Sequence, residues 1–228
     1  ILLPSFYADF QNNDGRFCSK DVAAEIEKLK AQNVDGIILD LRYNGGGSLR
    51  DVVKMTGLFV EKGPVVQVKA RGSEPEVLKD VDSRVQYDGQ LIVMVNSYSA
   101  SASEILAAAL QDYDRALIEG SPSTYGKGTV QRFINLDRTI RGFSEIKPLG
   151  EIKLTTQKFY RIDGGSTQLR GVTPDIVLPD NFYYIKTGER DRDYAMEWSE
   201  IAPVDYSQNV LKIDNVGELR EKSERRIA

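Results

Sequence analysis

Residues 91–131 read LIVMVNSYSASASEILAAALQDYDRALIEGSPSTYGKGTVQ, and this stretch decides the fold. Its opening apolar run, Leu91–Val95, predicts a buried strand. A ladder of serines follows, made of Ser97, Ser99, Ser101 and Ser103. An alanine-rich run to about Leu110 then predicts a helix, and a second short strand leads into a Gly/Ser/Pro loop that holds one lysine, Lys127. Strand, serine-led helix, strand and glycine-flanked lysine form a layout that can build an active site.

The same arrangement occurs once more, earlier in the chain. Residues 36–41 form a continuous apolar run with β-branched residues, which predicts a strand buried on both faces, as in a parallel sheet. A triple-glycine turn at 45–47 follows, and a helix is expected after it. Alternating strands and helices predict an α/β domain, and such sheets place their sites at the carboxyl ends of the strands.

The chain is expected to divide into a core and an appendage. The core runs over residues 1–180, from a first strand at 1–7 to an extended Pro-Asp-Ile-Val-Leu-Pro element at 174–179. From residue 181 charges and aromatics mix, which indicates an extended arm over 181–228 that ends in a charged helix from about Val216. The first residue is Ile1 rather than methionine, so we interpret the sequence as a mature or trimmed chain.

Composition limits the possible functions. The chain has 228 residues, 41% of them hydrophobic, and no apolar run long enough to span a membrane. The net charge of −4 is spread along the chain, and no basic block indicates nucleic-acid binding. A single cysteine, Cys18, excludes an internal disulfide and multi-thiolate zinc sites, and we interpret it as a passive small residue.

The sequence contains no histidine. This composition excludes the Ser-His-Asp triad, the Cys-His pair and His-ligated metal, so we expect no metal site and no cofactor. Any proton shuttle near neutral pH must therefore be a carboxylate, a tyrosine or a lysine with a displaced pKa.

Ser101 has two possible roles. Ser101-Ala102-Ser103-Glu104 matches a capping box, so Ser101 can simply begin the helix. A serine that follows a buried strand at a helix start also occupies the place of an exposed nucleophile, although the G-x-S-x-G elbow is absent. In that case the N–H of Ala102 would point at the developing oxyanion.

Lys127 is the candidate base for such a serine. The Walker phosphate loop is rejected, because five residues separate Gly120 from Gly126 and Gly128 replaces the Ser/Thr that holds Mg²⁺. A solvated turn lysine remains the alternative. A lysine accepts a proton only when neutral, which requires burial or a nearby positive field. Gln131, four positions later, can orient the amine without adding a negative charge.

The triple-glycine turn is similarly open. It can present N–H groups to phosphate or to an oxyanion, or it can be a tight strand-to-helix turn without a ligand. A dinucleotide fingerprint would need a third glycine where Arg50 stands.

Five motifs in order resemble the C-terminal processing or tail-specific peptidases. They are residues 96–105 (NSYSASASEI), 125–131 (YGKGTVQ), 39–47 (LDLRYNGGG), 153–160 (KLTTQKFY) and 171–176 (GVTPDI). They span roughly the first 180 residues, and the tail at 193–198 (DYAMEW) resembles the longer, bacterial tail-specific branch.

This resemblance implies a crotonase/ClpP-like core of stacked ββα units with a mixed, largely parallel sheet. It implies a serine endopeptidase with Ser101 as the nucleophile, Lys127 as the base and Gln131 as its orienting partner. The oxyanion hole would use the N–H groups of Ala102 and of one turn glycine, for which we choose Gly46. The implied substrates are proteins or peptides with apolar C-termini, and the implied location is the periplasm of the bacterial cell envelope.

Two departures from the family pattern stand out. The loop at 121–125 is one residue longer than expected, which can shift Lys127 or only lengthen the loop. The family's PDZ domain should precede the Gly36 strand and its helix, so we expect it elsewhere in the full-length chain. Two other functions remain as alternatives: a crotonase-like enzyme acting on acyl thioesters, which would need a carboxylate base, and a non-catalytic scaffold of the same fold.

Overall fold

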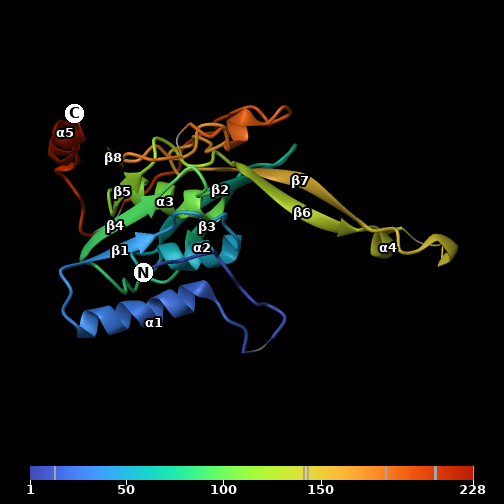
Figure 1. The fold of residues 1–228 in the computed structure, drawn as a ribbon. Coiled ribbons are helices and arrows are strands. Elements are labelled where there is room, and N and C mark those ends of the chain that lie inside the picture. Colours follow the sequence, from blue (N-terminus) through green and yellow to red (C-terminus); the bar gives the residue numbers. More distant parts are fainter. Residues whose placement is uncertain (13, 141, 143, 183, 208–209, 228) are drawn as a thin grey trace.

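The computed structural model describes residues 1–228 except 13, 141, 143, 183, 208–209 and 228 (Figure 1). It confirms the α/β class, and its strands form two separate four-stranded sheets. The elements are α1 (Cys18–Ala31), β1 (Gly36–Asp40), α2 (Leu49–Thr56), β2 (Gly63–Ala70), β3 (Glu76–Asp80), β4 (Gln90–Val95), α3 (Ala102–Asp112), β5 (Leu117–Gly120), β6 (Thr129–Asn135), α4 (Leu136–Thr139), β7 (Glu151–Tyr160), β8 (Ile176–Val177) and α5 (Val216–Ile227), with short 3₁₀ turns η1 (Ser144–Ile146) and η2 (Glu189–Asp191).

The first sheet is parallel, with the strand order β1-β4-β5-β8. β1 and β4 pair in register from Gly36 with Gln90 to Asp40 with Met94, so their carboxyl ends meet at one edge. The glycine turn follows β1 and the serine ladder follows β4. The two turns that the sequence places after buried strands therefore lie next to each other.

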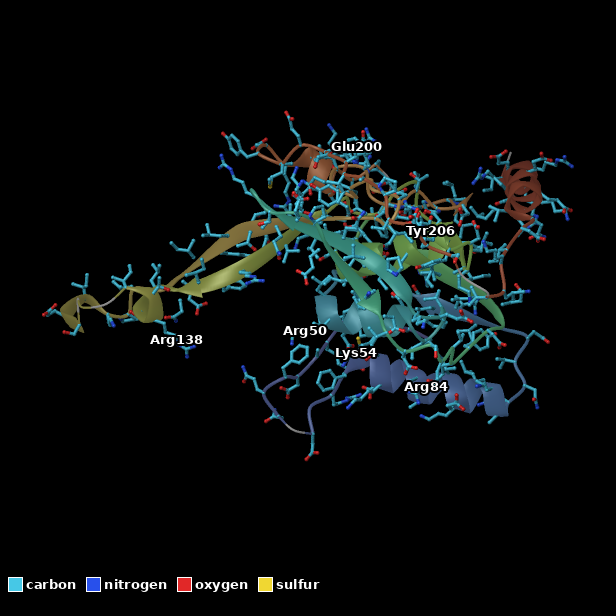
Figure 2. All side chains as sticks on the ribbon, turned by 180° about the vertical axis from the view of Figure 1, so that it is seen from behind. Arg50, Lys54, Arg84, Arg138, Glu200 and Tyr206 are labelled. Atoms are coloured by element: carbon cyan, nitrogen blue, oxygen red, sulfur yellow. The ribbon has the colours of Figure 1, made fainter. Side chains whose placement is uncertain are left out.

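The second sheet is antiparallel, with the order β3-β2-β7-β6. β6 and β7 continue beyond the body of the protein as a two-stranded arm that carries α4 (Figure 1). Arg138 lies near the far end of this arm (Figure 2). Gln131 lies near the base of the arm, where β6 leaves the lysine loop.

Helix α3 lies between the two sheets, in contact with β5 of one and β2 of the other. Its nine residues from Ala102 to Leu110 are all buried. Small alanines allow this close approach on every side, and a helix that is apolar all round is buried all round. The serine that precedes α3 is thus attached to a helix that is buried along most of its length.

Strand β1 differs from the prediction that both of its faces are buried. Ile37 and Leu39 belong to the core, whereas the side chain of Ile38 is 50% exposed. β1 is an edge strand, and the core packs against one of its faces only. Residues 1–7 also form no regular strand, only isolated parallel bridges of Leu2 with Asp40 and of Phe6 with Gly47.

The segment after residue 180 returns to the core before it reaches α5. Its backbone bonds include Glu189 N–H to Tyr125 O at 2.8 Å and Val204 N–H to Ile162 O at 2.9 Å. α5 contacts β8 at the edge of the parallel sheet. The division at residue 180 stays a prediction. Among the described residues, none of the helices is both long and apolar enough to cross a membrane.

Candidate active site

The hydroxyl groups of the four ladder serines have different environments. Ser99 donates its hydroxyl to Leu41 O at 2.8 Å. Ser103 donates to Asn44 O at 2.8 Å, so both hydroxyls tie the strand–helix turn to the neighbouring β1 turn. Ser101 instead lines a cavity of about 220 Å³ together with Lys127 and Gln131. Ser101 is therefore the ladder serine that faces both residues named as its partners.

Ser101 sits in a strained backbone conformation at the start of α3. Its φ is 59° and its ψ is −112°, a region that side-chain-bearing residues rarely adopt. Its N–H donates to Glu104 Oε2 at 2.8 Å, while its hydroxyl makes no capping bond to the helix. The Glu104 half of the predicted capping box is therefore formed. A sharp strand-to-helix turn with the side chain directed at a cavity is the geometry of an exposed nucleophile.

Two backbone segments border the Ser101 side chain. Ala102 lines the cavity, and its N–H has no partner among the described residues. Gly46 (φ 100°) lies so close that an added Cβ would be 2.8 Å from Ser101 Cβ and 3.0 Å from Ala102 N. The N–H of Gly46, however, donates to Asn44 Oδ1 at 2.9 Å. Gly45 and Gly47 line the cavity instead. Gly46 as the oxyanion donor stays a prediction, and this bond counts against it.

Glu104 connects the turn of Ser101 to the lysine loop. Its carboxylate is fully buried and accepts from Ser101 N–H at 2.8 Å and from Lys127 N–H at 3.0 Å. The Thr124 hydroxyl and Gly126 N–H donate to its other oxygen, each at 2.6 Å. Burial raises the pKa of Glu104 to about 7, while the four donors oppose this rise.

Lys127 is held at its backbone and half-buried at its side chain. Its N–H binds Glu104, and its carbonyl accepts from the Thr167 hydroxyl at 3.0 Å. Burial lowers the pKa of the Lys127 amine, and the charge of Lys153 lowers it further, whereas Glu189 and Glu104 raise it. Lys127 is therefore not a solvated turn lysine. A lowered pKa is the property that a lysine base needs.

The nucleophile and base candidates line the same cavity. Among the described residues, no hydrogen bond joins the Ser101 hydroxyl or the Gln131 amide to the Lys127 amine. Gln131 is exposed on β6. Sites without substrate are often looser than reacting ones, so the roles of these three residues remain predictions.

Comparison with known proteins places this geometry in a family. The model for peptidase family S41 matches residues 3–178. The chain belongs to peptidase family S41. A second model, the C-terminal domain of tail specific protease, matches residues 182–228. The resemblance read from the five sequence motifs is confirmed.

The similar proteins are longer than this chain. A tail-specific protease of Haemophilus influenzae is 44% identical over all of this chain, which covers 32% of that relative. A carboxy-terminal-processing protease of Bartonella bacilliformis is 38% identical over 75% of this chain and 38% of the relative. The solved structure of a photosystem II D1 C-terminal processing protease superposes with a TM-score of 0.63 at 28% identity, covering 78% of this chain and 41% of that one.

Three charged residues of this S41 chain were not predicted for the site. The sequence assigns Glu104 only a capping role, and its bonds to the lysine loop join residues more than 20 positions apart. Lys153 lines the cavity from β7. Glu189 approaches from the C-terminal segment. The alternation of residues along β6 and β7 is the one sequence signal that could have placed Lys153 on the Gln131 face.

The remaining chemistry-bearing groups lie elsewhere. Cys18 is buried, and its thiol donates to Asp51 Oδ2 at 2.7 Å. Burial and the Asp51 carboxylate raise the pKa of this thiol, which agrees with a passive role. The part of the chain that the structure describes contains no group of three or more His, Cys, Asp or Glu residues suited to a metal ion.

Proposed function

We propose that this chain is the catalytic core of a serine endopeptidase in which Ser101 is the nucleophile and Lys127 its general base. The observation that carries the proposal is the shared cavity, which joins a strained serine at a buried helix start to a half-buried lysine of lowered pKa. With no histidine in the sequence, a lysine amine is the basic group available there, and we assign this role to the half-buried Lys127.

The reaction follows from these positions. Neutral Lys127 takes the hydroxyl proton as Ser101 Oγ attacks the peptide carbonyl carbon, and the negative charge passes to the carbonyl oxygen. The N–H of Ala102 and one N–H of the glycine turn donate to that oxygen. The Lys127 ammonium then returns the proton to the leaving amine as the C–N bond breaks. A water activated by the same lysine hydrolyses the acyl-enzyme. Gln131 orients the amine.

The second oxyanion donor has two possible sources in the turn. Gly46 N–H serves only if it leaves Asn44 Oδ1. Gly45 and Gly47 already line the cavity, and neither N–H has a partner among the described residues. We therefore favour a donor from Gly45 or Gly47 while Asn44 stays bound to Gly46.

The substrate class and the cellular location are inferred from the family and from the names of the relatives. We infer that the full-length protein cleaves protein substrates recognised by an apolar C-terminal tail, with a PDZ domain outside this chain, in the bacterial periplasm. The acyl-thioester alternative needs a carboxylate base, and none of the described residues that line the cavity has a carboxylate. No observation favours that alternative or the scaffold.

The test uses the full-length protein and a peptide substrate with an apolar C-terminus. Ser101→Ala and Lys127→Ala should each lower kcat/KM by about a thousand-fold or more while circular dichroism stays unchanged. Ser97→Ala is the matched control, since Ser97 lines a different cavity, and its activity should persist. A fluorophosphonate probe should label Ser101. Near-normal turnover by Lys127→Ala would show that the base is another group.

A further inference from the structure

Lys153 is a second lysine in the cavity of Ser101 and Lys127. In the β6–β7 pair, Gln131 lies opposite Thr155 and Phe133 lies opposite Lys153. Alternate residues share a face of a strand, so Gln131 and Lys153 point to the same side. The Lys153 ammonium is 5.4 Å from the centre of the Phe133 ring. Lys153 is exposed to solvent, and among the described residues it has no ion-pair partner.

Glu189 approaches the lysine loop from the C-terminal segment. Its N–H donates to Tyr125 O at 2.8 Å, two residues before Lys127. One carboxylate oxygen accepts from Gln168 Nε2 at 3.4 Å, and the other lies 4.0 Å from Arg192 Nε. The Glu189 side chain is 16% exposed, so its charge is poorly screened by water.

Three charged residues approach Lys127 from different elements. Lys153 on β7 lines its cavity, Glu189 in η2 is bonded to Tyr125 of the same loop, and Glu104 on α3 accepts the Lys127 backbone N–H. Lys153 lowers the pKa of Lys127, adding to the effect of burial, and the two carboxylates raise it. The Glu104 carboxylate also accepts the backbone N–H groups of Ser101 and Lys127, so its substitution would move the lysine loop. Lys153 and Glu189 leave room for substitution.

We propose that Lys153 and Glu189 are positioning residues that act on Lys127 with opposite signs and thereby set the pH range in which the enzyme works. Lys153 destabilises an ammonium at position 127 and so favours the neutral base. Glu189 stabilises that ammonium and so reduces the fraction of Lys127 that is neutral at a given pH. The inference rests on the proposed function, and it makes β7 and the C-terminal segment parts of the catalytic unit.

The experiment measures kcat/KM of the full-length protein against pH. The wild-type profile should rise with pH, because the neutral fraction of Lys127 grows as pH passes its pKa. Lys153→Met should move the midpoint of this rise to higher pH by about half a unit or more, and Glu189→Gln should move it to lower pH by a similar amount. Lys153→Arg should keep the wild-type midpoint, and the double variant should lie between the two single ones.

Two variants of matched chemistry serve as controls. Lys147→Met removes a lysine that bonds to Asp137 O, away from the cavity, and Glu200→Gln removes a carboxylate of the C-terminal segment (Figure 2). Neither should move the midpoint. A Lys153 with a purely structural role would lower kcat at every pH with an unchanged midpoint, and this result would overturn the inference, as would shifts of the same sign in Lys153→Met and Glu189→Gln.

The results also distinguish a failure of this inference from a failure of the proposed function on which it rests. If Lys127→Ala is inactive and the midpoints do not move, the assignment of the base holds and only the roles of Lys153 and Glu189 fall. If Lys127→Ala stays active, the base assignment falls, and the inference falls with it.

Discussion

The Glu104 carboxylate accepts four hydrogen bonds while it is completely buried. One bond comes from the turn of Ser101 and three come from residues 124–127. A single side chain thus joins the segments that carry Ser101 and Lys127, the proposed nucleophile and base. Its place in the first turn of α3 also suits a negative charge, because the helix N-terminus is positive.

Glu104→Gln tests this link. The amide has one acceptor oxygen, so its NH₂ group must face donors that now face a carboxylate oxygen. Leaving such buried donors unpaired should cost about 2–3 kcal/mol of unfolding free energy, measured by urea denaturation. Activity should fall as well, because the Ser101 and Lys127 segments lose their common anchor. Glu119→Gln is the control, since the Glu119 carboxylate, unlike its backbone in β5, has no hydrogen-bond partner among the described residues. Equal stability of the two variants would contradict the role of Glu104.

At the residue scale, the sequence predicts residue types better than it predicts their contacts. The absence of histidine directs attention to Lys127, and the serine ladder to Ser101. The bond from Gly46 N–H to Asn44 Oδ1 depends on a side-chain rotamer in a turn, which no spacing encodes. The bonds of Glu104 depend on how a loop more than 20 residues later returns to α3.

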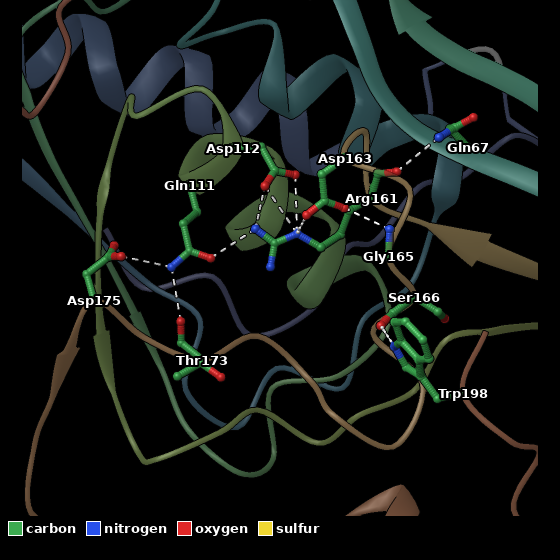
Figure 3. Close-up of polar contacts among 10 residues, drawn as sticks. All are labelled: Gln67, Gln111, Asp112, Arg161, Asp163, Gly165, Ser166, Thr173, Asp175 and Trp198. Carbon is green, nitrogen blue, oxygen red and sulfur yellow. Dashed lines mark hydrogen bonds and ion pairs between the residues drawn. The ribbon is translucent and has the colours of Figure 1, made fainter. Parts of the chain in front are cut away.

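The end of α3 is tied to the end of β7 by a charged cluster (Figure 3). Arg161 pairs with Asp112 and also donates to Gln111 Oε1 at 3.1 Å. Gln111 in turn donates to Thr173 O at 3.0 Å and Asp175 Oδ1 at 2.9 Å. The helix that begins after Ser101 is therefore joined at its other end to the end of β7, the strand that carries Lys153.

Asp112→Asn should destabilise the protein, because it leaves the Arg161 charge partly unpaired where its side chain is 19% exposed. The expected loss is about 3 kcal/mol of unfolding free energy. Asp163→Asn is the matched control, since the Asp163 side chain is 50% exposed and lies 3.6 Å from the same guanidinium; it should cost less than about 1 kcal/mol. Adding Arg161→Met to Asp112→Asn should cost less than the sum of the single losses. Additive losses would contradict the pairing.

At the element scale, the sequence predicts strong periodic elements and misses those set by their neighbours. The strands at β1 and β4 and the helix α3 follow from apolar runs. The open face of β1 does not, because exposure of Ile38 depends on its place at the sheet edge. The segment 1–7 reads as a strand, but it lies beside β1 and the glycine turn with only isolated bridges.

The whole molecule combines a dense centre with an extended arm. α3 and β4 lie in the core, whereas the outer parts of β6 and β7 expose both faces, with Phe133 at 67% and Leu154 at 45% exposure. A two-stranded ribbon without a packed face is only marginally stable by itself. Ser101 thus precedes a helix that is buried from Ala102 to Leu110, while Gln131 and Lys153 lie at the root of an exposed arm.

Amide hydrogen exchange on the full-length protein can measure this contrast. Exchange from α3 and β4 requires opening of the core and should follow the global unfolding free energy. Exchange from the arm beyond Phe133 and Lys153 requires only local opening, so it should be faster by about a hundred-fold or more. Arm amides that exchange as slowly as those of β4 would contradict this expectation. Such protection would require other parts of the protein to pack against the arm, and the described residues do not do so. The root of the arm, at Gln131 and Thr155, should exchange at an intermediate rate, because its pairing continues into the body through β2.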